Sequence, residues 1–265
     1  HINRRAYHIN VNLDRGALTR NKTPDLGIPC DSGGLLVKLA NAGVHAEPDK
    51  IAPWLQTLAD RELAREKEIV EQAKKPMKLI NPVDFFARTA ENLTRKTILV
   101  ADGGDFVATG AYILRPGGPL TWLDPGVFGT LGVGAGFALG AKIARPDHDV
   151  IILYGDGSAG YSLMEFDTFA RHGIAVGAII GNDACWTQIY RDQIDILKDD
   201  VACMLDYTHY DEIAKTFGGA GKTISKPAQI KAGLAALRQS LKRKKPFVLN
   251  VLIGRSEFRK GSISM

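Results

Sequence analysis

Two acidic residues stand at the ends of two apolar runs, and their spacing is the strongest chemical signal in the sequence. Asp156 follows the apolar run 150–154, and Asp183 follows the run 175–180. The carboxylates are 27 residues apart (183 − 156), about the length of one strand–helix–strand unit. In a parallel sheet the carboxyl ends of neighbouring strands meet at one edge, where ligands bind. We therefore expect Asp156 and Asp183 to lie together at such an edge.

The residues around Asp156 suit a phosphate group bridged by a cation. Gly155 and Gly157 allow backbone N–H groups to approach a phosphate closely, and a helix that begins here favours negative charge. Because Asp156 would repel a bare phosphate, the site needs a cation, and Mg²⁺ binds carboxylates together with phosphate oxygens. The alternative is a tight turn in which Asp156 or Ser158 caps the helix. The second acidic residue, Asp183, favours the metal site.

Apolar runs alternate with amphipathic segments from about residue 78 onward. Strands alternating with helices form mainly parallel sheets that are covered on both faces. The sequence therefore predicts an α/β fold of this kind. We expect strands at 97–100, 120–123, 150–154, 175–180 and 247–253, a helix starting at Asn81, and helices at 129–144, 163–170, 210–217 and 228–241.

The chain divides into three predicted segments. Residues 1–44 contain one strand and one helix, too little to cover their own apolar surface, and look like the tail of an α/β unit; the family resemblance given below implies that they are the C-terminal end of an incomplete central domain. Residues 45–77 are interpreted as a linker with a polar surface helix at 54–74. Residues 78–265 form the predicted diphosphate- and Mg²⁺-binding domain.

Composition narrows the class of protein. Three widely spaced cysteines, Cys30, Cys185 and Cys203, predict neither a disulfide framework nor a zinc site and favour a reducing compartment. The net charge of +5 comes largely from the basic run 242–245. No aromatic residues alternate with these charges, so we expect a solvated helix end and no nucleic-acid partner. The chain begins at His1 without methionine, and we expect it to be part of a longer protein.

Several motifs together resemble a known family. Gly-Asp-Gly-Ser at 155–158 followed by Gly-Asn-Asp at 181–183 resembles the signature of thiamine-diphosphate-dependent enzymes related to acetolactate synthase and pyruvate decarboxylase. The segment 125–134 resembles the family's Gly-Thr-Met-Gly segment, and 102–105 resembles its first diphosphate-contacting loop. The resemblance extends over 78–253 and implies thiamine diphosphate and Mg²⁺ as cofactors.

The resemblance also implies roles for individual residues. Asp156 and Asp183 would bind Mg²⁺ through their side chains, and Cys185 through its main-chain carbonyl. Leu131 would be the apolar residue that supports the folded cofactor, while Trp186 would either line the cofactor or pack in the core. The residues implied near the cofactor are Gly103, Gly104, Asp105, Gly129, Thr130, Leu131, Gly155, Gly157, Ser158 and Asn182.

Two departures from the family pattern stand out. Asp183 replaces the usual asparagine, which either increases the dependence on Mg²⁺ or marks an altered site. The family activates the cofactor with a glutamate from a pyrimidine-binding domain, and nothing in residues 1–265 resembles that domain. No catalytic residue is therefore assigned in this chain. The activating glutamate is expected upstream, acting across the interface of a homodimer or homotetramer.

Three functions stay open from the sequence. The first is cleavage of a 2-hydroxyacyl-CoA substrate to formyl-CoA and an aldehyde, as in fatty-acid α-oxidation. The second is carboligation or decarboxylation of 2-oxo acids, as in acetolactate synthase. The third is cofactor binding without catalysis, because the domain that carries the activating glutamate is absent. The resemblance implies a location at the endoplasmic reticulum membrane through an upstream anchor, and otherwise the cytoplasm.

Overall fold

The computed structural model describes residues 3, 5–43 and 47–260, in two compact units, His1–Ala64 and Arg65–Met265. The first unit contains strands β1 (Ile9–Val11) and β2 (Leu26–Ile28), which pair in parallel, and helix α1 (Ser32–Asn41). Asp31 caps α1 by accepting a hydrogen bond of 2.5 Å from the Gly34 N–H. The predicted strand and helix are thus present, as a small parallel α/β element. The boundaries proposed at residues 44 and 77 stay predictions.

The polar helix α2 (Pro48–Ala73) begins earlier than predicted. Proline is well tolerated in the first turn of a helix, where its missing N–H has no partner to lose, so Pro48 can start the helix. Ile69 is its only buried residue, as expected for a surface helix. Among the described residues, no helix combines the length and the apolar character that crossing a membrane requires.

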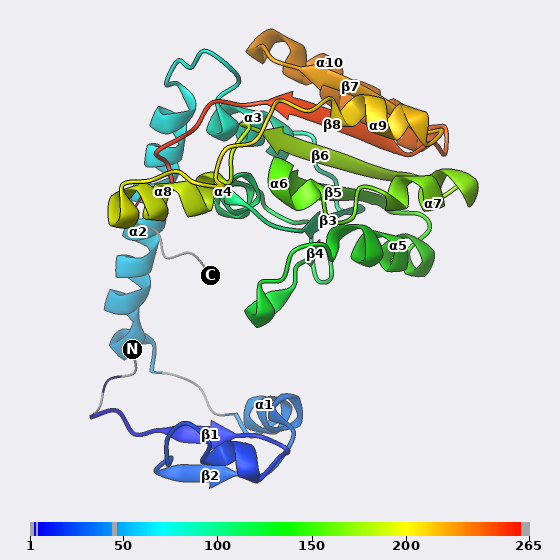
Figure 1. The fold of residues 1–265 in the computed structure, drawn as a ribbon. Helices are drawn as coiled ribbons and strands as arrows, with labels where there is room; N and C mark the ends of the chain where they lie inside the picture. The colour runs from blue at the N-terminus through cyan, green and yellow to red at the C-terminus, as the bar shows by residue number, and fades with distance from the viewer. Residues whose placement is uncertain (1–2, 4, 44–46, 261–265) are drawn as a thin grey trace. The chain divides into compact units, whose positions relative to one another are not determined.

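The second unit is built on a six-stranded sheet in the order β4-β3-β5-β6-β8-β7 (Figure 1). All neighbouring strands are parallel, so the predicted fold class is confirmed. Strand β7 was not predicted, because it is an edge strand with a single buried residue, Ile224. The strands are β3 (Thr97–Ala101), β4 (Trp122–Leu123), β5 (Asp149–Gly155), β6 (Val176–Asn182), β7 (Ala220–Ile224) and β8 (Phe247–Leu252).

Helices cover both faces of this sheet, because successive strand residues point to opposite sides. Ile151 and Leu153 pack in one apolar cluster, whereas Val150 and Ile152 pack in the other. The first cluster includes residues of α3 (Pro82–Ala90), α4 (Asp105–Ile113) and α10 (Ile230–Lys242). The second includes residues of α5 (Gly134–Ala144), α6 (Asp156–Ala159), α7 (Glu165–Arg171) and α9 (Tyr210–Thr216).

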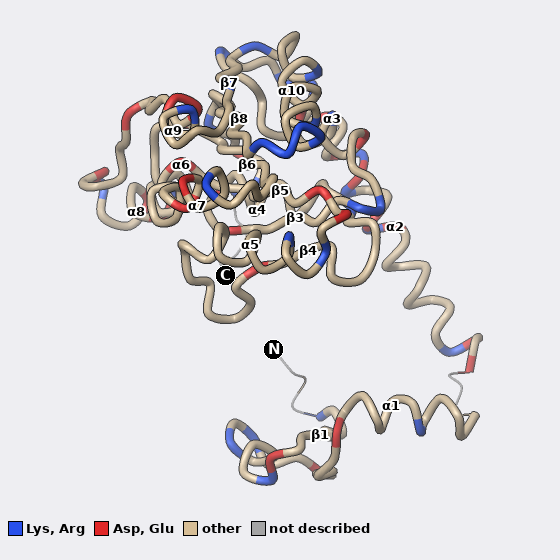
Figure 2. Tube along the Cα trace, turned by 90° about the vertical axis from the view of Figure 1, so that its right-hand side faces the viewer, with Lys and Arg blue, Asp and Glu red and all other residues tan. Residues whose placement is uncertain are grey.

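Further helices differ from the sequence prediction, and α4 was not among those predicted. Helix α5 begins at Gly134 rather than near residue 129, because Gly129 and Gly132 have φ angles of 56° and 91°, outside the helical region. Helix α8 (Thr187–Leu197), after β6, was not predicted at all. The basic run 242–245 ends α10 in solvent, and Figure 2 shows blue segments near this helix.

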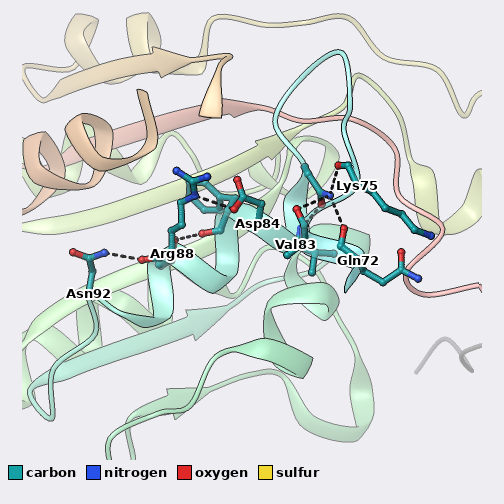
Figure 3. Close-up of polar contacts among 10 residues, drawn as sticks. Gln72, Lys75, Val83, Asp84, Arg88 and Asn92 are labelled. Carbon is teal, nitrogen blue, oxygen red and sulfur yellow. Dashed lines mark hydrogen bonds and ion pairs between the residues drawn. The ribbon is translucent and has the colours of Figure 1, made fainter. Parts of the chain in front are cut away.

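The end of α2 is fastened to the start of α3 by one buried side chain, Asn81. Its Oδ1 accepts a hydrogen bond of 2.9 Å from the Val83 N–H, which caps α3. Its Nδ2 donates to the carbonyl oxygens of Gln72 and Lys75, at 2.8 and 3.0 Å. These three partners converge in Figure 3. The cap fixes where α3 enters the layer against the sheet.

Candidate metal and cofactor site

Asp156 and Asp183 lie at the tips of two neighbouring strands. Strands β5 and β6 pair with Gly155 opposite Gly181, so the residues that follow them emerge at the same edge of the sheet. Both aspartates are buried, with 3% and 8% of their surface exposed, and both line one pocket. The structure therefore brings together the two carboxylates that the sequence placed at this edge.

The pocket is small, and apolar side chains line it together with the two aspartates. Its walls come from the turn between β3 and α4, the start of α6, the segment that follows β6, and Ile253 after β8. The cavity measures about 30 Å³, whereas one water molecule needs roughly 10–15 Å³. It has room for a small ion with a water molecule, so a larger ligand has to lie partly outside it.

Burial makes this pair of carboxylates unfavourable without a cation. Burial raises the pKa of Asp156, against the lowering effect of N–H groups from Gly157 at 2.8 Å and Cys185 at 3.2 Å. Burial also raises the pKa of Asp183 to about 7. A hydrogen bond of 2.5 Å from the Thr187 hydroxyl opposes this shift, and the charge of Asp156 adds to it. A divalent cation between the carboxylates would remove this repulsion.

The donor set fits Mg²⁺. Carboxylate and carbonyl oxygens are the ligands that this hard ion prefers. Among the described residues, no three His, Cys, Asp or Glu side chains converge on a metal position. Main-chain and ligand oxygens would have to complete the coordination shell of such an ion. Ala184, with a left-handed φ of 54°, turns the chain between Asp183 and Cys185, and the Cys185 carbonyl stays the predicted third protein ligand.

Glycines bring three backbone segments into direct contact beside the pocket. A Cβ atom at Gly103 would lie 2.2 Å from Leu131 Cδ2, and one at Gly104, where φ is 103°, would lie 3.3 Å from the Gly155 Cα. The Gly155 N–H donates to the Gly103 carbonyl at 2.9 Å. Larger residues would force these segments apart. Leu131 packs on Gly103, and its predicted support of the cofactor stays a prediction.

Two polar residues of the predicted cofactor set are engaged within the protein. The Ser158 hydroxyl donates to the Gly103 carbonyl at 3.0 Å. Asn182 is fully buried and does not line the pocket. Its Nδ2 donates to the Thr208 carbonyl at 3.1 Å, and its Oδ1 accepts from the Ala184 N–H at 3.3 Å. Both side chains thus hold the loops around the pocket, and the Ser158 hydroxyl contributes no donor to a ligand here.

Asp105 lines the pocket, but its carboxylate already has protein partners. Arg191 donates to both carboxylate oxygens, at 2.9 and 3.1 Å, and Arg259 lies 3.6 Å away. In the structure the carboxylate thus belongs to an ion pair within the protein. Its contact with cofactor or substrate stays a prediction.

The structure brings together only part of the predicted set. Gly129 and Thr130 lie on an exposed loop and do not line the pocket, and neither does Leu131. The predicted residues that do line it are Gly104, Asp105, Gly155, Asp156, Gly157, Ser158, Asp183 and Cys185.

The sequence analysis placed Asp102 in the family-like segment 102–105 without giving it a role, missed Thr187 and left the role of Trp186 open. The Asp102 carboxylate accepts hydrogen bonds from the N–H groups of Gly132 at 3.0 and 3.1 Å and Gly134 at 2.7 Å, which ties the end of β3 to the start of α5. Trp186 lines the pocket and packs on Gly157, where an added Cβ would lie 2.6 Å from the indole. Two signals were available for Asp102, namely its place directly after an apolar strand and its place in the segment 102–105 that resembles the family's loop.

Comparison with known proteins identifies related sequences. Residues 102–251 match the family described as "Thiamine pyrophosphate enzyme, C-terminal TPP binding domain". The chain is 45% identical to 2-hydroxyacyl-CoA lyase 2 of Danio rerio over 272 residues, covering all of this chain and 43% of that protein. It is 44% identical to 2-hydroxyacyl-CoA lyase 2 of Homo sapiens over 264 residues, covering 96% of this chain and 41% of that protein.

More distant relatives share the fold. The acetolactate synthase large subunit of Mycobacterium tuberculosis is 38% identical over 202 residues, which covers 75% of this chain and 36% of that protein. A solved thiamine diphosphate-dependent 4-hydroxybenzoylformate decarboxylase from Rhodococcus jostii superimposes with a TM-score of 0.72 at 20% identity, covering 94% of this chain and 44% of that chain. The chain thus spans less than half the length of these proteins.

Proposed function

Because this chain belongs to the thiamine pyrophosphate enzyme family, we propose that it is the cofactor- and Mg²⁺-binding part of a lyase that cleaves 2-hydroxyacyl-CoA to formyl-CoA and an aldehyde. The observation that carries this proposal is the convergence of Asp156 and Asp183 in one buried pocket. The similarity to proteins named 2-hydroxyacyl-CoA lyase 2 over the full length of this chain supports the substrate class.

The residues of this chain would bind and orient the cofactor. Asp156, Asp183 and the Cys185 carbonyl would hold Mg²⁺, and the N–H groups of Gly157 and Ser158 would donate to the diphosphate. Thiamine diphosphate, when bound, supplies the electron sink for breaking a C–C bond. The close packing of glycine backbones beside the pocket would exclude water from its base.

We further propose that a pyrimidine-binding domain supplies the activating glutamate and that the enzyme works as a homodimer or homotetramer. The share of the related proteins that the chain spans, about 43%, supports a further domain, whereas the oligomeric state is carried over from the family resemblance alone. A location at the endoplasmic reticulum membrane also stays a prediction.

The direct test is product analysis with the full-length protein, thiamine diphosphate and Mg²⁺. A 2-hydroxyacyl-CoA substrate should give formyl-CoA and an aldehyde that is one carbon shorter. The similarity to acetolactate synthase favours one alternative, in which pyruvate is converted and the thioester is left intact. Cofactor binding without turnover of either substrate would show a non-catalytic protein.

A further inference from the structure

Arg255 lies where three parts of the pocket region meet. Strand β8 ends at Leu252, and the next residue, Ile253, lines the pocket. Arg255 comes two residues after Ile253. Its guanidinium carbon stacks 5.1 Å from the centre of the Tyr190 ring on α8. Its Nη2 lies 3.5 Å from the sulfur of Met204, and Met204 forms a backbone bridge with Cys185. Arg255 is therefore held at the rim of the predicted metal site.

The contacts of Arg255 fix its position without neutralising its charge. Within the described part of the chain, its side chain contacts an aromatic face and a thioether sulfur, which is a weak acceptor. A guanidinium that stacks on an aromatic ring keeps the N–H groups of its edge available. The residue is exposed. Arg255 thus presents a charged, oriented donor group to any ligand that reaches the rim.

A second arginine near the pocket, Arg191, differs from Arg255 because its charge is paired with a carboxylate. Arg191 follows Tyr190 on the same helix, and the carboxylate of Asp105 binds its guanidinium through two hydrogen bonds. That side chain is only 18% exposed. Arg191 is therefore committed to holding the walls together, whereas among the described residues no carboxylate lies within ion-pair distance of Arg255. The charge of Arg255 also reaches the pocket, since it lowers the pKa of Asp183.

We propose that Arg255 is a specificity-determining residue that binds an oxyanion of the substrate. This inference rests on the proposed function of the site. The planar guanidinium can donate two parallel hydrogen bonds to a phosphate or a carboxylate. In the proposed lyase the oxyanion is a phosphate of the coenzyme A portion, and in a 2-oxo acid enzyme it is the substrate carboxylate. Stacking on Tyr190 reduces the entropy that this contact costs.

The test compares Arg255→Gln and Arg255→Lys with Arg243→Gln in the full-length enzyme. Arg243 is exposed and precedes β8, at the opposite end of the strand that Arg255 follows. The substrates are a 2-hydroxyacyl-CoA, the same acyl group on pantetheine, which lacks phosphates, and pyruvate. We expect Arg255→Gln to raise the KM for the CoA thioester about 10- to 100-fold with kcat nearly unchanged, as for the loss of a charge-assisted contact.

Two further results are expected for phosphate recognition. The KM for the pantetheine thioester should not change in Arg255→Gln, and Arg255→Lys should recover part of the affinity for the CoA thioester. If Arg255 instead binds a substrate carboxylate, Arg255→Gln should raise the KM for pyruvate. Arg243→Gln should resemble the wild type on every substrate.

Other outcomes overturn the assignment. The assignment is wrong if Arg255→Gln leaves the KM values for both the CoA thioester and pyruvate unchanged. It is also wrong if the variant changes only the dissociation constant of thiamine diphosphate. If the wild type converts pyruvate alone, the proposed lyase function fails, and the KM for pyruvate still tests Arg255. If neither substrate reacts, calorimetric binding of coenzyme A decides, because equal affinity in the wild type and Arg255→Gln contradicts the proposal.

Discussion

The carboxylate of Asp105 is bound through both oxygens by Arg191, a residue 86 positions further along the chain. Both side chains are largely buried, with 12% and 18% exposed. Asp105 begins α4, and Arg191 lies on α8. The pair therefore fixes two walls of the pocket relative to each other.

Replacing Arg191 by methionine should loosen these walls. Removal of one partner from a buried ion pair leaves an uncompensated charge, and the partial exposure here lowers the expected cost to about 2–3 kcal/mol. Hydrogen exchange of α4 and α8, followed by mass spectrometry, measures this local opening. The control is Arg171→Met on α7, which breaks an exposed pair with Asp167 and should cost less than about 1 kcal/mol. Unchanged exchange in α8 of Arg191→Met would show that the pair is dispensable.

Asp156 and Asp183 should determine how strongly Mg²⁺ stabilises the protein against thermal unfolding. Asp156→Asn or Asp183→Asn removes one of two carboxylates, so we expect Mg²⁺ affinity in the presence of thiamine diphosphate to fall at least about 100-fold. Mg²⁺ at 100 times its dissociation constant should stabilise the wild type by about 2.7 kcal/mol. Thermal unfolding with and without Mg²⁺ measures this shift, which both variants should lose.

The matched control for the metal prediction is Asp195→Asn. Asp195 is exposed on α8 and does not line the pocket, so this variant should keep the full response. A normal Mg²⁺ shift in Asp156→Asn would exclude this pocket as the metal site.

The contact between Gly157 and Trp186 predicts a specific rescue. Gly157→Ala places a Cβ 2.6 Å from the indole, and overpacking of this kind costs about 1–3 kcal/mol. Trp186→Leu removes the ring, so the double variant should recover most of this loss. Thermal unfolding measures each variant. Gly136→Ala serves as the control, because a Cβ there meets nothing within 4 Å. Additive effects of the two substitutions would contradict the contact.

The buried Asp102 predicts a pH dependence of stability. Burial raises its pKa above the ordinary value of 3.8, despite the N–H groups of Gly132 and Gly134. The folded state therefore retains its proton at a pH where the unfolded chain has released it. Stability from this group is complete below about pH 3.8 and is lost as the pH rises through the raised value.

Asp102→Asn should remove this dependence. The free energy of unfolding of the wild type, measured against this variant, should fall as the pH rises from about 4 towards neutrality. Chemical denaturation of both proteins across this range provides the comparison. The prediction is wrong if the free energy of unfolding of the wild type rises with pH relative to that of Asp102→Asn. That result would show that the hydrogen bonds of the ionised carboxylate outweigh its burial.

Much of the fold could be predicted from local sequence, because buried parallel strands are continuous apolar runs. β3, β5, β6 and β8 are of this kind. β7 could not be predicted, since an edge strand needs no such run. The start of α5 was placed too early because the composition of 129–133 suits a helix, whereas the backbone angles of Gly129 and Gly132 do not.

The sequence by itself determined that Asp156 and Asp183 end neighbouring strands, because spacing along an α/β chain fixes which sheet edge a residue reaches. Only the tertiary structure decided which other side chains share that edge. Asp105 pairs with Arg191, Asn182 points into a buried network, and Arg255 stacks on Tyr190. These contacts join segments that are far apart in sequence, and their geometry depends on how helices pack, which no local pattern encodes.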